Sequence, residues 1–280
     1  MGRHIASGRE HPIFYYGSAY AGTLESHLMA VVFRIVGSSV WAYRFTLMIF
    51  IGVLIGFVFA TARRMFDRTA AVAAAAYLAI PPYYFLYKGL TSDGAYTSLS
   101  ALTAAILYGA VRMDESIDRK PGKTTAWFAF TGLAAGLAWW VDPLVGGVCV
   151  GVLAWFAIVR LTVFRRLRDL AAFAGGFLIG ALPWFLGNVG KGWPSLHSPS
   201  IRWLTQSEAV KQFVRFWTDA VPVLFGARPF TGQPDVARGA TVVAFLAYAI
   251  PTVLALAVVI RYRRRLRVVT GSDREAQSAR

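Results

Sequence analysis

The sequence is poor in charged residues and almost devoid of cysteine. Only 15% of its 280 residues are charged and 56% are hydrophobic, whereas globular proteins average about 25% charged and roughly 45–50% apolar residues. The single cysteine, Cys149, lies in an apolar run, so no intrachain disulfide can form and the redox compartment cannot be read from cysteine usage. This composition favours a membrane protein.

The sequence also lacks the short motifs of several enzyme classes. It contains no GxxxxGK[ST], HExxH or GxSxG, which argues against a P-loop, a zincin and an α/β-hydrolase. No signal peptide is evident, since the polar start MGRHIASGREHP has no apolar core behind it. The formal net charge of +15 would suggest nucleic acid in a soluble protein, but the basic residues gather between apolar segments, so no nucleic acid partner is expected.

Apolar segments of about the length of a membrane span recur along the chain; such a span needs about 20 residues. The segments cover about residues 41–62, 69–88, 94–112, 124–141, 143–162, 170–189 and 239–260, and the second contains a Pro81-Pro82 break. Small residues are frequent in them, as in helices that pack closely within lipid. The sequence therefore predicts an all-α polytopic transmembrane bundle of about seven spans. It forms one domain over residues 1–268, followed by a disordered cytoplasmic tail at 269–280.

Basic residues are concentrated in alternate connections between these segments. They are Arg63, Arg64, Arg68, Arg112, Arg119, Lys120, Lys123, Arg160, Arg165, Arg166, Arg168, Arg261, Arg263, Arg264, Arg265 and Arg267. The opposite short connections hold Lys88 alone and, around Asp142, nothing basic. By the positive-inside rule the first set and the C-terminus are cytoplasmic, and residues 1–40 and 190–238 form outer loops.

The N-terminal outer loop has no span before it. We favour the explanation that a preceding helix is missing through truncation or a wrongly chosen start codon; a first span that translocates a short N-terminal tail is the alternative. Residues 24–37 carry an apolar stripe of Leu24, Leu28, Val31, Val32 and Ile35 but are too short to span. We expect this segment to be a helix lying in the outer membrane interface.

Five stretches of the chain together carry a family resemblance. They are YYGSAYAGTLESHLMAVVFRIVGSSVWAYRFTLMIF, RRMFDRTAAVAAAAYLAIPP, GLTSDGAY, GLAAGLAWWVDPL and VPVLFGARP. In this order they resemble segments of the GT-C membrane glycosyltransferases, closest to the family 39 and protein O-mannosyltransferase-like enzymes. The resemblance covers roughly residues 12–260. Each motif is weak alone, but their order and topology together are fairly specific.

The resemblance implies an integral protein of the cell membrane, a hexosyltransferase-type enzyme of the cell envelope. It would transfer a sugar from a polyprenyl-phosphate donor to a glycan, lipid or protein acceptor on the extracytoplasmic face. In the family, an aspartate just after the first span normally serves as base or orients the acceptor, and neither that span nor its acidic motif is in this sequence. No cofactor is assigned, although a divalent metal stays open. A catalytically inactive, truncated relative is one rival interpretation.

A transporter or flippase is the other rival. Transporters tend to place ionisable residues near the middle of the bilayer. Here the middles of the predicted spans are almost free of charge, and the candidate site acids Glu25, Asp93 and Asp142 sit on predicted outer loops. This distribution favours an enzyme that acts at the outer face.

Two carboxylates are the candidate catalytic residues, because sugar transfer needs an acid or base to activate the acceptor. Asp93, in LTSDGAY, could contact the acceptor or a metal, or could simply N-cap the helix that starts at Gly94. Glu25 could be an active-site acid, or a first-turn carboxylate favoured by the helix dipole. Asp142, in WWVDPL, is a weaker candidate, because an acid before proline is most often a turn former.

Histidines offer no regular metal-ligand spacing. His27 could contribute to a metal site together with His11, but no metal site is assigned. The neighbouring Trp139 and Trp140 are adequately explained as interface-belt aromatics.

Cations near the outer boundary are candidates for holding the donor phosphate. Lys88 could bind phosphate or merely snorkel to the headgroups. Arg44 lies in the first turn of a span, where a charge is costly unless it is partnered by phosphate or by Glu25. Tyr96 and Arg202 complete the candidate substrate-binding set.

The long outer loop contains one predicted amphipathic helix. Residues 207–218, SEAVKQFVRFWT, suggest a basic helix capped by Ser207. Such a helix could grip lipid phosphate or lie on anionic headgroups.

Overall fold

The computed structural model describes residues 1–81, 83–91, 95–117, 121–196 and 205–224, together with Ile250 and Val253. Within these residues the regular elements are helical, apart from an isolated β-bridge between Phe14 and Gly22. The chain divides into two compact units. The larger unit comprises Met1–Pro81 and Leu86–Trp203, and the smaller one comprises Pro82–Phe85 and Leu204–Arg280.

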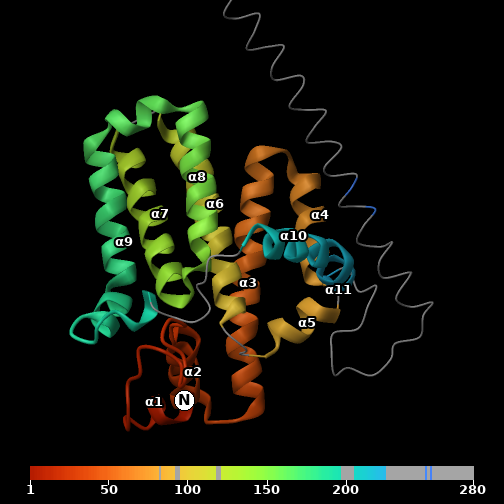
Figure 1. The fold of residues 1–280 in the computed structure, drawn as a ribbon, viewed down its shortest axis with the longest axis vertical. Helices are drawn as coiled ribbons and strands as arrows, with labels where there is room; N and C mark the ends of the chain where they lie inside the picture. Colours follow the sequence, from red (N-terminus) through yellow and green to blue (C-terminus); the bar gives the residue numbers. More distant parts are fainter. Residues whose placement is uncertain are drawn as a thin grey trace, which may run out of the picture. The chain divides into compact units, whose positions relative to one another are not determined.

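The larger unit is a bundle of helices with a small N-terminal helical layer (Figure 1). Its elements are α1 (Gly2–Ala6), α2 (Leu24–Val36), α3 (Val40–Met65), α4 (Arg68–Ala79), α6 (Tyr96–Ile117), α7 (Pro121–Val141), the 3-10 turn η1 (Pro143–Val145), α8 (Gly146–Val159), the 3-10 turn η2 (Leu161–Arg165), α9 (Leu167–Asn188) and the 3-10 turn η3 (Pro194–Leu196). Helix α5 (Tyr83–Gly89) begins in the smaller unit and ends in the larger. The smaller unit also holds α10 (Gln206–Arg215), the π-helical η4 (Phe216–Ala220) and α11 (Val221–Leu224).

Two of the described helices, α3 and α9, are long and apolar enough to cross a membrane. The third and fourth predicted spans, at 94–112 and 124–141, coincide closely with α6 and α7, although these helices are not among the two. The remaining predicted spans correspond less well. The fifth becomes η1 followed by α8, which has only 14 residues. The seventh, at 239–260, lies outside the described residues except for Ile250 and Val253. The helical fold is therefore established for the described part of the chain, whereas a bundle of seven spans stays a prediction.

The second predicted span, at 69–88, is interrupted where the sequence indicates a Pro81-Pro82 break. Helix α4 ends at Ala79, and α5 begins at Tyr83. Ile80 adopts φ −119° and ψ 68°, outside the helical region. Because a residue before proline is disfavoured in the helical region, the Pro81-Pro82 pair interrupts the helix here.

Helices α7 and α9 pack through glycines on both sides. Gly132 and Gly136 of α7 face the backbone of α9, and Gly176 and Gly180 of α9 face the backbone of α7. A Cβ atom at any of the four would collide with a main-chain carbonyl of the other helix. This small-xxx-small pattern lets two helix backbones come into direct contact, as the abundance of small residues predicted.

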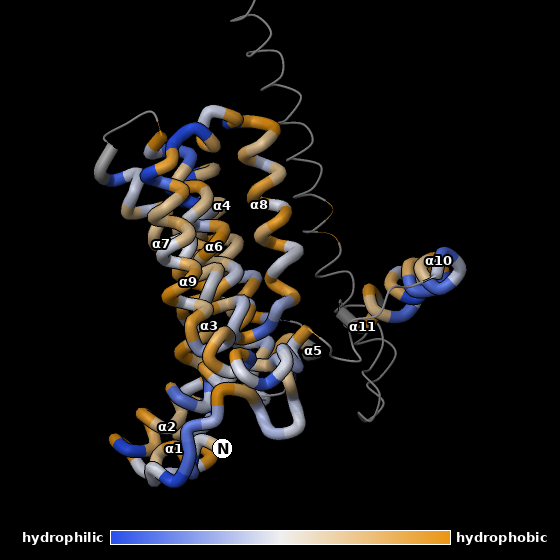
Figure 2. The backbone as a smooth tube through the Cα atoms, turned by 60° about the vertical axis from the view of Figure 1, so that its left-hand side comes forward, coloured by the Kyte–Doolittle hydropathy of each residue, from blue (hydrophilic) through white to orange (hydrophobic). Residues whose placement is uncertain are grey.

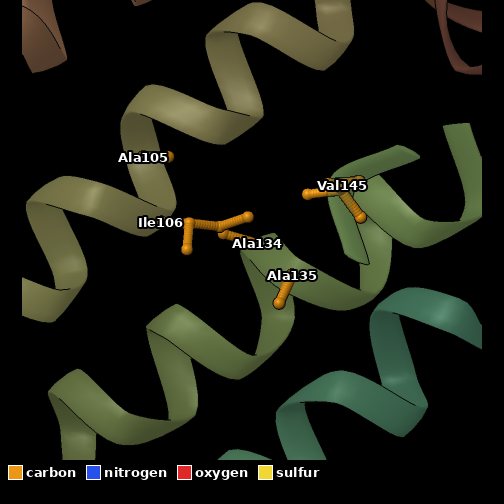
Figure 3. Close-up of a cluster of buried hydrophobic side chains, with 6 residues drawn as sticks. Ala105, Ile106, Ala134, Ala135 and Val145 are labelled. Atoms are coloured by element: carbon orange, nitrogen blue, oxygen red, sulfur yellow. The ribbon is translucent and has the colours of Figure 1, made fainter. Parts of the chain in front are cut away.

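The core of the larger unit is built mostly from small side chains. One cluster joins α6, α7 and η1 (Figure 3) and consists of Ala105, Ile106, Ala134, Ala135, Ala138 and Val145. A second cluster joins α6 and α7 to α8 and η2 and consists of Met113, Ile117, Phe128, Phe156 and Val163. Alanine at the contact positions allows close helix packing, and the larger side chains fill the remaining gaps.

One end of the bundle carries most of the ion pairs. Here Arg64 Nη1 lies 2.8 Å from Glu115 Oε2, and Arg160 Nε lies 2.9 Å from Asp114 Oδ1. Arg166 Nη2 donates to the carbonyl of Ile117 at 2.8 Å. These contacts join the ends of α3, α6 and α8 to the start of α9, a hydrophilic rim in Figure 2. We call it the arginine end. It gathers three of the predicted cytoplasmic connections; which side of a membrane it faces stays a prediction.

In the smaller unit, α10 begins with a capping box and carries apolar residues on one face. Its N-cap is Thr205, not the predicted Ser207, because the Thr205 hydroxyl accepts from the Glu208 N–H while the Glu208 carboxylate accepts from the Thr205 N–H. Such a capping box satisfies two backbone donors that a helix start leaves unpaired. One face of α10 carries apolar residues, among them Val210, Phe213 and Val214, all exposed.

Candidate functional site

The N-terminal segment docks on the end of α7 that lies away from the arginine end. The N–H of Gly22 donates to Val141 O at 2.9 Å, and Trp140 Nε1 donates to Ile13 O at 3.0 Å. A Cβ atom at Gly22 would collide with the carbonyl of Trp140, so this approach requires glycine. The start of α6 and the ends of α7 and α9 meet the N-terminal segment here. We call it the Glu25 end.

Glu25 is fully buried, in the first turn of α2. Its Oε1 accepts a hydrogen bond of 3.0 Å from the backbone N–H of Ser98, 73 residues later in the chain. Ser98 is the third residue of α6, so its N–H is one of the donors that a helix start leaves without an intrahelical partner. Glu25 thereby stabilises the first turn of α6 and ties α2 to it.

Lys88 and Tyr96, both predicted to bind substrate, lie together. Lys88 Nζ is 5.9 Å from the centroid of the Tyr96 ring, within the range of a cation–π contact. The hydroxyl of Thr97 donates to the carbonyl of Lys88 at 3.4 Å. The first turn of α6 therefore contacts the last turn of α5, and Tyr96 remains 45% exposed.

Arg44 is exposed one turn inside the start of α3. Its neighbours Trp41 and Phe45 are also exposed, so the guanidinium emerges from an apolar surface. Among the ion pairs of the described residues, none joins Arg44 to Glu25, and the role of Arg44 stays a prediction. Glu25 itself is enclosed and directed toward α6.

Asp142 is a turn former in the structure. Its Oδ1 accepts from the Leu144 N–H at 2.9 Å and caps η1, and only 4% of the residue is exposed. Burial raises the pKa of the Asp142 carboxyl above its ordinary value of 3.8, against a smaller opposing effect of the Leu144 hydrogen bond. This geometry supports the structural interpretation, and a direct role at a site stays a prediction.

His27 contacts neighbouring residues at the Glu25 end. Its Nδ1 lies 2.9 Å from the Thr23 carbonyl, and its ring centroid lies 6.1 Å from that of Trp140. Among the described residues, no three His, Cys, Asp or Glu side chains come together as metal ligands. These contacts do not test whether the protein binds a divalent metal, and that question stays open.

Trp140 is not a lipid-facing belt residue, contrary to the sequence-based expectation. It is 7% exposed, because its indole N–H is directed to Ile13 and its ring packs near His27. Trp139 is partly buried, with its ring centroid 5.9 Å from that of Trp184. Both tryptophans thus contribute to packing at the Glu25 end.

Two predicted site residues, Asp93 and Arg202, lie outside the described residues. Their roles stay predictions from the sequence. Conversely, sequence reasoning missed Ser98 and Thr97, which make the contacts of the first α6 turn. The polar run that includes these two residues, YTSLS, was the available signal, but it was read as the start of a span.

The described chain is thus an α-helical protein with two helices suited to a membrane and a set of polar contacts at one end. Comparison with protein families matches residues 23–186, more than half of the 280-residue chain, to the dolichyl-phosphate-mannose-protein mannosyltransferase family. The chain belongs to this family of membrane-embedded glycosyltransferases, and the resemblance seen in the sequence is confirmed. Searches of curated proteins and of solved structures gave no match.

Proposed function

We propose that this protein transfers a sugar from a polyprenyl-phosphate donor to a glycan, lipid or protein acceptor at the outer face of a membrane. Family membership carries the proposal, because the match at residues 23–186 includes α2 through most of α9. The reaction needs an acidic group for the acceptor, cations for the phosphate leaving group and an apolar surface for the lipid. The candidates are Asp93 for the acidic group, Lys88 and Arg44 for the phosphate, and exposed apolar residues of α3 such as Trp41 and Phe45 for the lipid.

In this proposal Asp93 is the acidic group that activates or orients the acceptor. It precedes α6 by three residues in the sequence. Lys88 neutralises the donor phosphate, with Tyr96 beside its ammonium. Arg44 emerges among exposed apolar residues of α3, where a lipid phosphate at the membrane boundary would meet it.

The charge distribution of the two candidate spans supports an enzyme over a transporter. In α3 the ionisable side chains Arg44, Arg63 and Arg64 lie near its two ends, and in α9 Arg168 and Asp169 lie in the first turn. Transporters commonly hold ionisable residues near the bilayer midplane. An outer-face site fits this distribution better.

The test is sugar transfer by membranes that contain the full chain, measured with a radiolabelled polyprenyl-phosphate hexose. Asp93→Asn should lower the rate at least about 100-fold, because it removes an acid–base group. Asp67→Asn is the matched control: Asp67 caps α4 at the arginine end, and asparagine caps as well as aspartate. Equal rates for Asp93→Asn and wild type would remove Asp93 from the site.

A further inference from the structure

We infer that Glu25 is a positioning residue: by holding the first turn of α6, it sets the Lys88–Tyr96 pair that receives the donor phosphate. The inference rests on the proposed function in one respect, the binding of phosphate by Lys88. It gives Glu25 a role different from that of the catalytic acid predicted from the sequence.

The burial of Glu25 argues against direct contact with substrate. The residue has no exposed surface, and it lies beside the buried residues Thr23 and Ser26. Burying a carboxyl group is energetically unfavourable unless hydrogen bonds compensate for the lost contacts with water. The Ser98 N–H at 3.0 Å provides such a bond, at a helix start where negative charge is favoured. Glu25 is therefore directed at the α6 backbone.

The contacts of that turn lead on to Lys88. Ser98 is two residues after Tyr96, so fixing its amide also fixes the backbone from which the Tyr96 ring projects. Thr97, between them, donates to the carbonyl of Lys88 at 3.4 Å. Tyr96 lies 5.9 Å from the Lys88 ammonium. The Glu25 carboxylate on α2 thus influences the Lys88 ammonium on α5 through three consecutive residues of α6.

A positioning residue and a merely structural one differ in a double-mutant cycle. The probe is a polyprenyl phosphate that binds the full chain in lipid nanodiscs, and polyprenol of the same length is the control ligand without phosphate. Lys88→Met should weaken polyprenyl phosphate binding and leave polyprenol binding unchanged. Glu25→Leu should weaken phosphate binding roughly tenfold, by loss of the bond to α6. In the Lys88→Met background, Glu25→Leu should have no further effect.

Two conservative variants keep the test decisive if Glu25→Leu fails to fold. Glu25→Gln retains an acceptor oxygen for the Ser98 N–H and should retain most of the binding. Tyr96→Leu removes the ring beside Lys88 without touching Glu25, and it should reproduce the loss. Ser26→Ala is the matched control, because Ser26 is a buried neighbour of Glu25 on the same helix.

The outcomes separate the inference from the proposed function. If Lys88→Met leaves phosphate binding unchanged, Lys88 does not hold the phosphate, and the proposed phosphate role fails together with the inference. If Lys88→Met weakens binding but the Glu25 and Tyr96 variants do not, only the inference is overturned. Equal losses from Glu25→Leu with and without Lys88, or for polyprenol as well, would also overturn it, because they indicate a general structural effect.

Discussion

The indole N–H of Trp140 donates to the carbonyl of Ile13, 127 residues earlier, at 3.0 Å. The bond holds the N-terminal segment against the end of α7. Ile13 O also accepts from the Thr23 N–H, so removal of the indole leaves this carbonyl with a partner. The expected cost of losing the bond is therefore at the low end for a hydrogen bond, about 1 kcal/mol.

Trp140→Phe should accordingly increase local opening of the N-terminal segment. A cost of about 1 kcal/mol corresponds to roughly fivefold more of the open state. Trypsin cleavage after Arg9, which is exposed, measures this opening in the detergent-solubilised protein. Trp155→Phe is the control, because Trp155 is 55% exposed on α8. An unchanged cleavage rate for Trp140→Phe would mean that the bond does not hold the segment.

Two adjacent glycines of α9 give a matched test of the α7–α9 contact. A Cβ atom at Gly176 would collide with Ala129 O, whereas a Cβ atom at Gly175 has nothing within 4 Å. Gly176→Ala should destabilise the protein by about 1–3 kcal/mol through overpacking. Gly175→Ala should be neutral or stabilising by up to about 1 kcal/mol, since alanine is the better helix former. Thermal unfolding in detergent measures both; equal midpoints would contradict the close packing.

The burial of Asp142 predicts a pH dependence of stability. Because burial raises the folded-state pKa of this carboxyl, the folded protein binds the proton more tightly than the unfolded chain does. The associated stability is fully present below the ordinary pKa of 3.8 and is lost as the pH rises through the raised folded-state pKa. Asp142→Asn retains a capping oxygen but cannot titrate.

The unfolding midpoint of Asp142→Asn relative to wild type should therefore increase across this window and then stay constant. Asp142→Ala also removes the cap of η1 and should be less stable than Asp142→Asn by about 1 kcal/mol at every pH. A constant midpoint difference between Asp142→Asn and wild type would show that Asp142 does not titrate differently in the folded state.

A helix could be predicted from the sequence when local residues determine it, and not when contacts with distant residues do. Hydropathy predicted α3 and α9 to within a few residues, because each is set by one continuous apolar run. The break after α4 was predicted from the Pro81-Pro82 pair, which is also a local signal. The five-residue α1 was missed: it is held by Arg34, whose Nε donates to Ala6 O at 2.9 Å, a contact with no local signal.

The same distinction between local and long-range interactions applies to the site residues. Glu25, Lys88 and Tyr96 were selected by residue type and position, and the last two do lie together. The bond from Ser98 to Glu25 joins segments 73 residues apart, and no sequence periodicity encodes it. Trp140 was assigned to lipid because aromatic residues at span ends usually lie there, whereas its partner Ile13 is supplied by a distant loop.

Charge balance on α10 and η4 distinguishes two ways of binding a membrane. The sequence suggested a basic helix, but the segment 205–221 carries Lys211 and Arg215 against Glu208 and Asp219, so its formal charge is zero. Its apolar residues are exposed and spaced as one helical stripe, which consists of Val210, Phe213, Val214 and Trp217. We therefore expect the helix to lie in the lipid interface through this stripe, with little dependence on anionic lipid.

Spin labels on the full chain in proteoliposomes test this prediction. With Cys149→Ala as background, a label at Val210 or Val214 should collide more with oxygen, which concentrates in lipid, than with a water-soluble nickel chelate. A label at Lys211 or Gln212, on the opposite face, should show the reverse, and both patterns should persist when anionic lipid is replaced by zwitterionic lipid. Free access of the chelate to Val210 and Val214 would place the stripe in water. Low access of both reagents would mean that protein covers the stripe. Loss of the pattern without anionic lipid would mean that the helix binds the membrane through its charged residues.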